Sequence, residues 1–298
     1  MMFRRESLLE ILAWLEARRA AGDALVFDVL DPDLGRGHYA GEHVEHAGET
    51  HVHRPLRVWV DLAERLGLRL RTPRPHGHLV TLSFEPLDPA ARLRGEAEDA
   101  TERYGAGSSF ARVHKLEEPG FVIDLRDALA RAALPEAPRV LDLGVNTGDE
   151  LALIAGSVPA ARFVGIDHSA SAIAVARERF PAAELHVADL SNLGALGLGR
   201  FDLVVSIGTL QSPGIDDREV VRRVVQDHLA PAGCVIFGFP NCRYVDGELE
   251  HGTRMKNFRQ PELGLLVKDV AFYRKYLQQH GRRVFVTGKH YVFVTGVP

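Results

Sequence analysis

The sequence predicts an α/β protein built around a doubly wound, mostly parallel sheet. Helical and strand patterns alternate from residue 120 to the end of the chain. The earlier strand segments of this region are continuous apolar runs, as expected of strands buried on both faces. The segment 139–143 runs into a turn with Gly144 and Gly148, and a helix follows. In doubly wound sheets such a turn holds a nucleoside.

The elements of this region follow one another in a regular order. Helices are expected at 121–133, 148–156, 169–179, 216–229 and 268–280. Strands are expected at 139–143, 162–166, 184–188, 201–206, 233–238, 283–287 and 291–295. Between the last two strands, Gly288-Lys289-His290 is a hairpin signal.

The N-terminal part predicts a smaller α/β module. Helices are expected at 6–20 and 55–66, and strands at 24–28, 68–71 and 78–84, with a histidine-rich loop over 31–53. The expected organisation is an accessory module at 1–95, a linker or cofactor-closing segment at 96–119 and a main domain at 120–298.

Composition excludes several classes of protein. The 298 residues are 46% hydrophobic and 26% charged with a formal net charge of −4, which gives no general attraction to nucleic acid or to anionic membranes. Cys234 and Cys242 are the only cysteines, so neither a disulfide framework nor a cysteine zinc site is expected. No segment has the apolar length of a membrane helix. These features predict a cytoplasmic protein without a membrane partner.

The spacing of the turn argues against a dinucleotide. Its pattern places Asp142, Gly144, Asn146 and Gly148 at every second position, unlike the G-x-G-x-x-G fingerprint of NAD and FAD sites. Asp149 and Glu150 then occupy the first turn of the helix, where carboxylates disfavour a diphosphate and favour a cationic ligand. An amino acid that carries a sulfonium suits this field.

With these motifs in order, residues 120–298 resemble a class I S-adenosylmethionine-dependent methyltransferase. The resemblance implies a Rossmann-like seven-stranded methyltransferase sheet whose last strand is antiparallel. It also implies S-adenosylmethionine as the cofactor. The segment 229–236 matches the family's turn into its fifth strand.

The resemblance carries over to individual residues. The methionine part would contact Asp142, Gly144, Asn146 and Gly148; the ribose Asp167; the adenine Asp189 and Leu190; and the methyl donor Ser206 and Ile207. Asn146 replaces the family's central glycine and tolerates a left-handed backbone. From the residues alone, Asp167 also suits a cap for the helix that starts at Ser169, and Asp189 also suits ordinary loop chemistry.

The acceptor side is less specific in sequence. Loops after the fourth and fifth strands of the main domain supply Gln211, Asn241 and Tyr244 as candidates for orienting an acceptor, or as ordinary loop residues. Arg112 is a candidate partner of the methionine carboxylate, or a solvated surface residue. The N/D-P-P-Y/F element of amino-methylating enzymes is absent after residue 206, which disfavours those reactions.

The predicted function is methyl transfer to a small-molecule acceptor by in-line displacement. An RNA or protein methyltransferase is the first alternative, because basic residues gather in the last third of the sequence. A non-catalytic S-adenosylmethionine-binding protein is a further alternative, and the glycine spacing disfavours a nicotinamide oxidoreductase. His38, His43, His46, His51 and His53 have spacings that also suit a metal, but a polar loop is the expectation, and no metal site is predicted.

Overall fold

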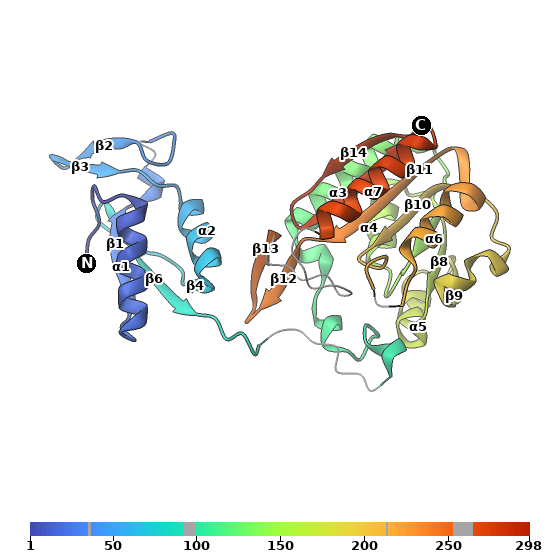
Figure 1. The fold of residues 1–298 in the computed structure, drawn as a ribbon, viewed down its shortest axis with the longest axis horizontal. Helices are drawn as coiled ribbons and strands as arrows, with labels where there is room; N and C mark the ends of the chain where they lie inside the picture. The colour runs from blue at the N-terminus through green and yellow to red at the C-terminus, as the bar shows by residue number, and fades with distance from the viewer. Residues whose placement is uncertain (35–36, 92–98, 213, 253–264) are drawn as a thin grey trace. The chain divides into compact units, whose positions relative to one another are not determined.

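The computed structural model describes residues 1–34, 37–91, 99–212, 214–252 and 265–298. Contacts divide the chain into two compact units (Figure 1). The first comprises Met1–Arg92 together with Tyr244–Glu250, and the second comprises Leu93–Arg243 together with His251–Pro298.

The first unit has an antiparallel sheet of order β1-β6-β4, with β5 also paired to β6. These strands are β1 (Leu25–Leu30), β4 (Leu68–Leu70), β5 (Arg74–His76) and β6 (Leu79–Pro86). The helices are α1 (Leu8–Ala20), which begins at a capping box of Ser7 and Glu10, and α2 (Leu56–Leu66), which ends at a left-handed Gly67. Their apolar faces and the sheet bury a common core around Phe27, Trp59 and Leu82.

The prediction of a loop over 31–53 is wrong for the second half of this range. There β2 (His43–His46) and β3 (Glu49–Val52) form an antiparallel hairpin, and a short 3₁₀ turn (Pro32–Leu34) precedes them. The two residues between the strands, Ala47 and Gly48, have φ of 52° and 78°. A two-residue hairpin turn of this kind needs positive φ at both positions, which alanine seldom adopts, so its sequence signal is weak.

The second unit contains the predicted sheet. Its seven strands have the order β14-β15-β11-β10-β7-β8-β9. They are β7 (Arg139–Leu143), β8 (Arg162–Asp167), β9 (Glu184–Val187), β10 (Phe201–Ile207), β11 (Leu229–Pro240), β14 (Arg283–Thr287) and β15 (Tyr291–Val297). The pairs from β9 to β11 are parallel, and β15 is antiparallel to both of its neighbours. The predicted fold class is therefore confirmed.

Helices cover both faces of this sheet (Figure 1). They are α3 (Pro119–Ala132), α4 (Asp149–Ser157), α5 (Ala170–Arg179), α6 (Asp217–Arg223) and α7 (Leu265–Gln279). Successive strand residues point to opposite faces, so Leu141 packs in the cluster that contains Tyr273 of α7, while Val140 packs in the cluster that contains Phe121 of α3. Burial on both faces explains the continuous apolar runs of the sequence.

Two local features differ from the expected elements. The helix expected at 216–229 is α6 followed by a π-helical turn at Val224–His228, and Leu229 already begins β11. A short ribbon of β12 (Cys242–Val245) and β13 (Glu248–His251) was not predicted. Its turn is Asp246-Gly247, with φ of 50° and 78°, so an Asp-Gly hairpin signal was present in the sequence.

In its described part, residues 99–118, the segment before α3 forms short 3₁₀ turns at Ala100–Glu102, Ser109–Arg112 and Lys115–Glu117. A further 3₁₀ segment, Leu190–Leu196, follows β9. Within the described ranges, no helix combines the length and the apolarity that crossing a bilayer requires.

Candidate functional site

The turn between β7 and α4 has left-handed backbone at three positions, and neighbouring side chains pack directly against its glycines. Gly144, Asn146 and Gly148 have φ of 85°, 47° and 88°, so Asn146 has the left-handed backbone that the sequence predicted. A Cβ on Gly144 would lie 1.9 Å from Thr209 Oγ1, and one on Gly148 would lie 2.8 Å from the Phe180 ring. Both glycines are therefore required by conformation and by space.

Asp142 is a buried carboxyl at this turn. It is 0% exposed, and neither carboxyl oxygen has a hydrogen-bond partner within the described part of the chain. Burial raises its pKa well above the usual range, and the neighbouring Glu150 raises it further, while Lys115 acts in the opposite direction. A buried carboxyl of this kind is either protonated or satisfied by a bound donor or cation.

Glu150 and Lys115 supply the charges nearest to Asp142. Glu150 Oε1 accepts a hydrogen bond from Lys115 Nζ, while Oε2 has no partner in the described residues. Lys115 Nζ also lies 5.7 Å from the centroid of the Phe121 ring. Burial lowers the pKa of Lys115, but the Glu150 carboxylate more than offsets this, so the pKa lies above its ordinary value. The charged groups near this turn are therefore two carboxyl groups, of Asp142 and Glu150, and one ammonium group, of Lys115.

Sequence reasoning missed Lys115 and Tyr291. Tyr291 begins β15, and a Cβ on Gly208, the residue after β10, would lie 3.7 Å from Tyr291 Oη. Burial raises the pKa of Tyr291 to about 12, so the phenol stays protonated. Its sequence position gives no signal, because the antiparallel return of β15 is what brings it back to the carboxyl end of β10. For Lys115 a signal existed, since it lies in the same segment as Arg112, which was preferred for its bidentate geometry.

Asp167, at the end of β8, is 8% exposed and already accepts backbone donors. Its Oδ2 accepts from Asn146 N at 2.9 Å, and its Oδ1 accepts from Ser169 N at 2.9 Å. The side-chain cap of α5 comes from Ser169, whose Oγ accepts from Ala172 N at 3.1 Å. Asp167 thus joins the glycine turn to the loop between β8 and α5.

The residues after β9 lie in different environments. Asp189 is exposed, and its Oδ1 accepts from Ser191 N at 2.7 Å; hydrogen bonds from the side chain and the backbone of Ser191 lower the pKa of the carboxyl. This contact caps the following 3₁₀ segment, the loop role considered for Asp189. Leu190 is 6% exposed and belongs to the core cluster beneath it.

The residues predicted near the methyl donor and the acceptor bond to backbone carbonyls or pack in the core. Ser206 Oγ donates to Leu143 O at 2.9 Å, and Ile207 is 4% exposed within the core cluster of α3. Asn241 Nδ2 donates to Lys289 O at 2.9 Å and so joins the end of β11 to the β14–β15 turn. Gln211 is 7% exposed.

The two remaining candidates are Tyr244 and Arg112. Tyr244 belongs to the first compact unit, not to the unit that carries the glycine turn. Arg112 is exposed, and no ion pair or hydrogen bond of its side chain is found in the described part of the chain.

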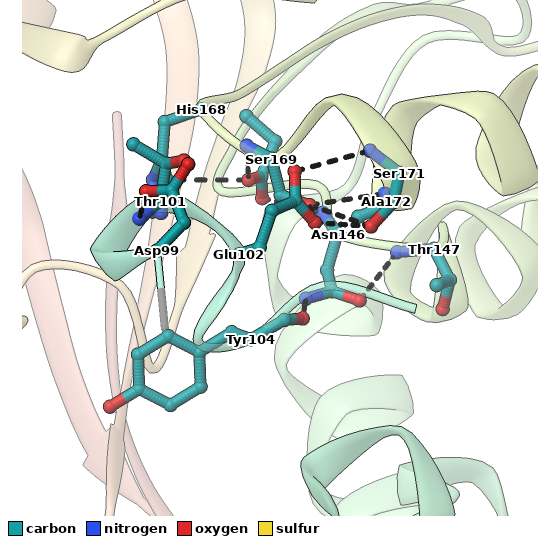
Figure 2. A network of polar contacts seen from close by, with 11 residues as sticks. Asp99, Thr101, Glu102, Tyr104, Asn146, Thr147, His168, Ser169, Ser171 and Ala172 are labelled. Carbon is teal, nitrogen blue, oxygen red and sulfur yellow. Dashed lines mark hydrogen bonds and ion pairs between the residues drawn. The ribbon is translucent and has the colours of Figure 1, made fainter. Parts of the chain in front are cut away.

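The segment before α3 is attached to both loops of the site (Figure 2). Asn146 Nδ2 donates to the carbonyl of Tyr104 at 2.8 Å. Glu102 Oε2 accepts from Ser169 Oγ at 2.9 Å and from Ser171 Oγ, and Ser171 Oγ accepts from Ala106 N at 3.0 Å. The contacts therefore reach the β7–α4 turn and the β8–α5 loop together.

The histidine-rich part forms ring contacts. The His78 ring lies 4.6 Å from that of His46 and 5.6 Å from that of His51, between ring centroids. His51 is 0% exposed, and burial lowers its pKa. In the ranges that the structure describes, no three His, Cys, Asp or Glu side chains are arranged to hold a metal ion.

The two cysteines contact a histidine ring and a backbone carbonyl. Cys242 Sγ lies 3.4 Å from His290 Nε2, and burial raises the pKa of this thiol to about 12. Cys234 Sγ donates to the carbonyl of Ala132 at 3.2 Å, inside the core. Both are thiols at neutral pH, which makes them weak nucleophiles.

Comparison with known proteins finds similarity to methyltransferases. A family model described as a methyltransferase domain matches residues 141–235. Trans-aconitate 2-methyltransferase of Variovorax paradoxus is 35% identical over 118 residues, which cover 40% of this chain and 44% of that protein. The protein of the same name from Delftia acidovorans is 30% identical over 146 residues, which cover 49% and 53%. The chain thus spans about half the length of these curated relatives.

Among solved structures, DesVI of Streptomyces venezuelae is 19% identical, with coverage of 63% of this chain and 98% of that chain and a TM-score of 0.43. Residues 141–235 match a methyltransferase domain, and this match and the strand order agree with the predicted resemblance of the second unit to the class I S-adenosylmethionine-dependent methyltransferases.

Proposed function

We propose that this protein is an S-adenosylmethionine-dependent methyltransferase that acts on a small-molecule acceptor. The observation that carries the proposal is the buried pair of carboxyl groups at the glycine turn. Among the described residues, Asp142 has no partner for either carboxyl oxygen and Glu150 has none for Oε2, while Lys115 supplies a single positive charge. This set of groups suits a ligand with a cationic head.

The residues present fit S-adenosylmethionine. When bound, this cofactor supplies a methyl group on a sulfonium, together with an ammonium that two acidic side chains can neutralise. Asp142, Gly144, Asn146 and Gly148 would hold its methionine part, and Gly144 lets the Thr209 side chain pack directly against this turn. A diphosphate would instead face Asp142 and Glu150, which are 0% and 1% exposed.

The remaining contacts follow the predicted assignment. Asp167 would accept the ribose hydroxyls, and Asp189 and Leu190 would border the adenine. Ser206 and Ile207 would lie beside the methyl group, where Ser206 acts through its bond to Leu143 O by fixing the end of β10. These residues bind and orient the donor and exclude water, which supplies much of the catalysis in an in-line displacement.

For the acceptor, Tyr291 is a better candidate than Asn241. The Asn241 amide is already used by Lys289 O, so it positions the turn before β15. The protonated phenol of Tyr291 lies against Gly208, at the carboxyl end of β10, where doubly wound sheets bind ligands. It would donate a hydrogen bond to an oxygen of the acceptor, with Gln211 as a second polar group of the same loop region.

The curated relatives suggest the acceptor class. They are named for trans-aconitate, a small unsaturated tricarboxylate. A carboxylate acceptor needs no separate base, since its oxygen is already a nucleophile, and a phenol donor can orient it. The acidic net charge of −4 further favours a small molecule over RNA.

Calorimetry and a transfer assay test this function. We expect S-adenosylmethionine and S-adenosylhomocysteine to bind and NADH not to bind, and we expect labelled methyl transfer to trans-aconitate or to another carboxylate in a metabolite panel. Binding of NADH without binding of the other two would refute the proposal. Binding of S-adenosylmethionine without turnover of any metabolite or RNA would favour a non-catalytic binding protein.

A further inference from the structure

We propose that Glu102 and Asn146 form a latch that holds Asp99–His114, here called the strap, on the donor loops and so controls donor entry and release. The proposal rests on the proposed function for the identity of the donor. The latch itself is defined by contacts inside the second unit.

The first contact of the latch is made by the residue that departs from the family's glycine. Asn146 Nδ2 donates to Tyr104 O at 2.8 Å, and Asn146 Oδ1 accepts from Thr147 N at 2.8 Å (Figure 2). Its φ of 47° is accessible to asparagine and to glycine. A glycine would thus satisfy the backbone, but it has no side chain to bond to Tyr104 O.

The second contact joins the strap to the β8–α5 loop. Glu102 Oε2 accepts from Ser169 Oγ and Ser171 Oγ, and these hydroxyls lower the pKa of the Glu102 carboxyl (Figure 2). Gly105 makes the room for this cluster, because a Cβ there would lie 2.0 Å from Glu102 Oε2 and 2.6 Å from Ser171 Oγ. A glycine at position 105 therefore allows the Glu102 carboxylate to reach both serine hydroxyls.

Asn146 and Ser169 each bond both to the strap and to Asp167. Asn146 bonds the strap with its side chain and Asp167 Oδ2 with its backbone N–H, at 2.9 Å. Ser169 bonds Glu102 with its hydroxyl and Asp167 Oδ1 with its N–H. Opening of the strap therefore loosens both loops that flank Asp167, the proposed ribose acceptor, which is the basis for control of donor exchange.

Two substitutions test the latch from opposite sides. Asn146→Gly keeps the backbone conformation and removes the side-chain bond to Tyr104. Gly105→Ala places a methyl group in the space of the Glu102 carboxylate. We expect each to raise amide hydrogen exchange in residues 99–114 of the protein without cofactor. We also expect each to increase the dissociation rate of S-adenosylhomocysteine, measured by surface plasmon resonance, by about 2- to 10-fold. Arg103→Ala, which removes a charge from the strap without breaking a latch contact, is the matched control.

The two readouts separate this proposal from the proposed function. Hydrogen exchange needs no cofactor, so unchanged protection of 99–114 in both variants would overturn the latch whatever the protein binds. Faster exchange with an unchanged dissociation rate would overturn its control of donor release. If wild type does not bind S-adenosylhomocysteine, the proposed function fails, and the exchange data still decide whether Asn146 and Gly105 hold the strap.

Discussion

Lys115 and Glu150 form an ion pair that joins the segment before α3 to the first turn of α4. Glu150 is 1% exposed and Lys115 is 22% exposed, so the pair is largely removed from water. A second carboxyl group, that of Asp142, lies near this pair and has no hydrogen-bond partner in the part of the chain that the structure describes. The pair therefore sets the charge at the place where we propose that a cationic donor binds.

Breaking this pair should destabilise the protein. Lys115→Met leaves the buried Glu150 carboxylate without its cation, and we expect a loss of about 3–5 kcal/mol in the free energy of unfolding, measured with urea. Adding Glu150→Gln should recover most of the loss. Lys275→Met, on the exposed side of α7, is the control for the chemistry of the change. Equal stability of the Lys115→Met variant and wild type would contradict the buried pair.

Asp142 should make stability depend on pH. Its pKa in the folded, cofactor-free protein is raised above the value of the unfolded chain, so the folded state binds more protons in that interval and stability falls as pH rises above about 4. Asp142→Asn removes this contribution to the pH dependence of stability. Its stability relative to wild type should increase by up to about 1.4 kcal/mol for each pH unit within the interval. A difference that stays constant between pH 4 and pH 8 would show that Asp142 is ionised throughout.

The same substitution should weaken donor binding. Asp142→Asn keeps the shape of the side chain but removes the charge that we propose faces the cationic head. We expect a more stable protein with S-adenosylmethionine affinity reduced about 10-fold or more, measured by calorimetry. An increase in stability with full affinity would remove Asp142 from the site.

Asp167→Ala should nearly abolish cofactor binding. The substitution removes the proposed ribose acceptor and also two backbone contacts, to Asn146 N and Ser169 N. Loss of charged hydrogen bonds of about 1.5–3 kcal/mol each predicts at least a 100-fold weaker affinity for S-adenosylhomocysteine. Glu178→Gln, on an exposed position of α5, controls for loss of an acidic charge in the domain. Wild-type affinity in the Asp167 variant would refute the site.

Tyr291→Phe should impair use of the acceptor without affecting binding of the donor. The phenylalanine keeps the ring contact with Phe121, at 5.3 Å between centroids, and loses only the hydroxyl. We expect kcat/KM for a carboxylate acceptor such as trans-aconitate to fall about 10-fold, with S-adenosylhomocysteine affinity unchanged. A parallel loss of cofactor affinity would place Tyr291 on the donor side instead.

The repeating strands and helices of the second unit were predictable because their patterns are local. Continuous apolar runs such as 139–143 and 201–206 predicted strands buried on both faces, and Leu141 and Val140 indeed pack in opposite cores. The glycine turn was predictable for a similar reason, since Gly144, Asn146 and Gly148 all need a backbone that few residues adopt. The hairpin at 43–52 was not, because its Ala47-Gly48 turn lacks that signal.

The sequence by itself determined the class of sheet, the order of its elements and the turn that marks the donor site, because these depend on hydrophobic period and backbone conformation. Only the tertiary structure decided which side chains meet there. Lys115 and Tyr291 reach the site from segments about 35 and 140 residues away from Glu150 in the chain. Asn241 and Ser206, by contrast, are occupied by backbone partners. Such pairings depend on long-range packing, which leaves no periodic signal in the sequence.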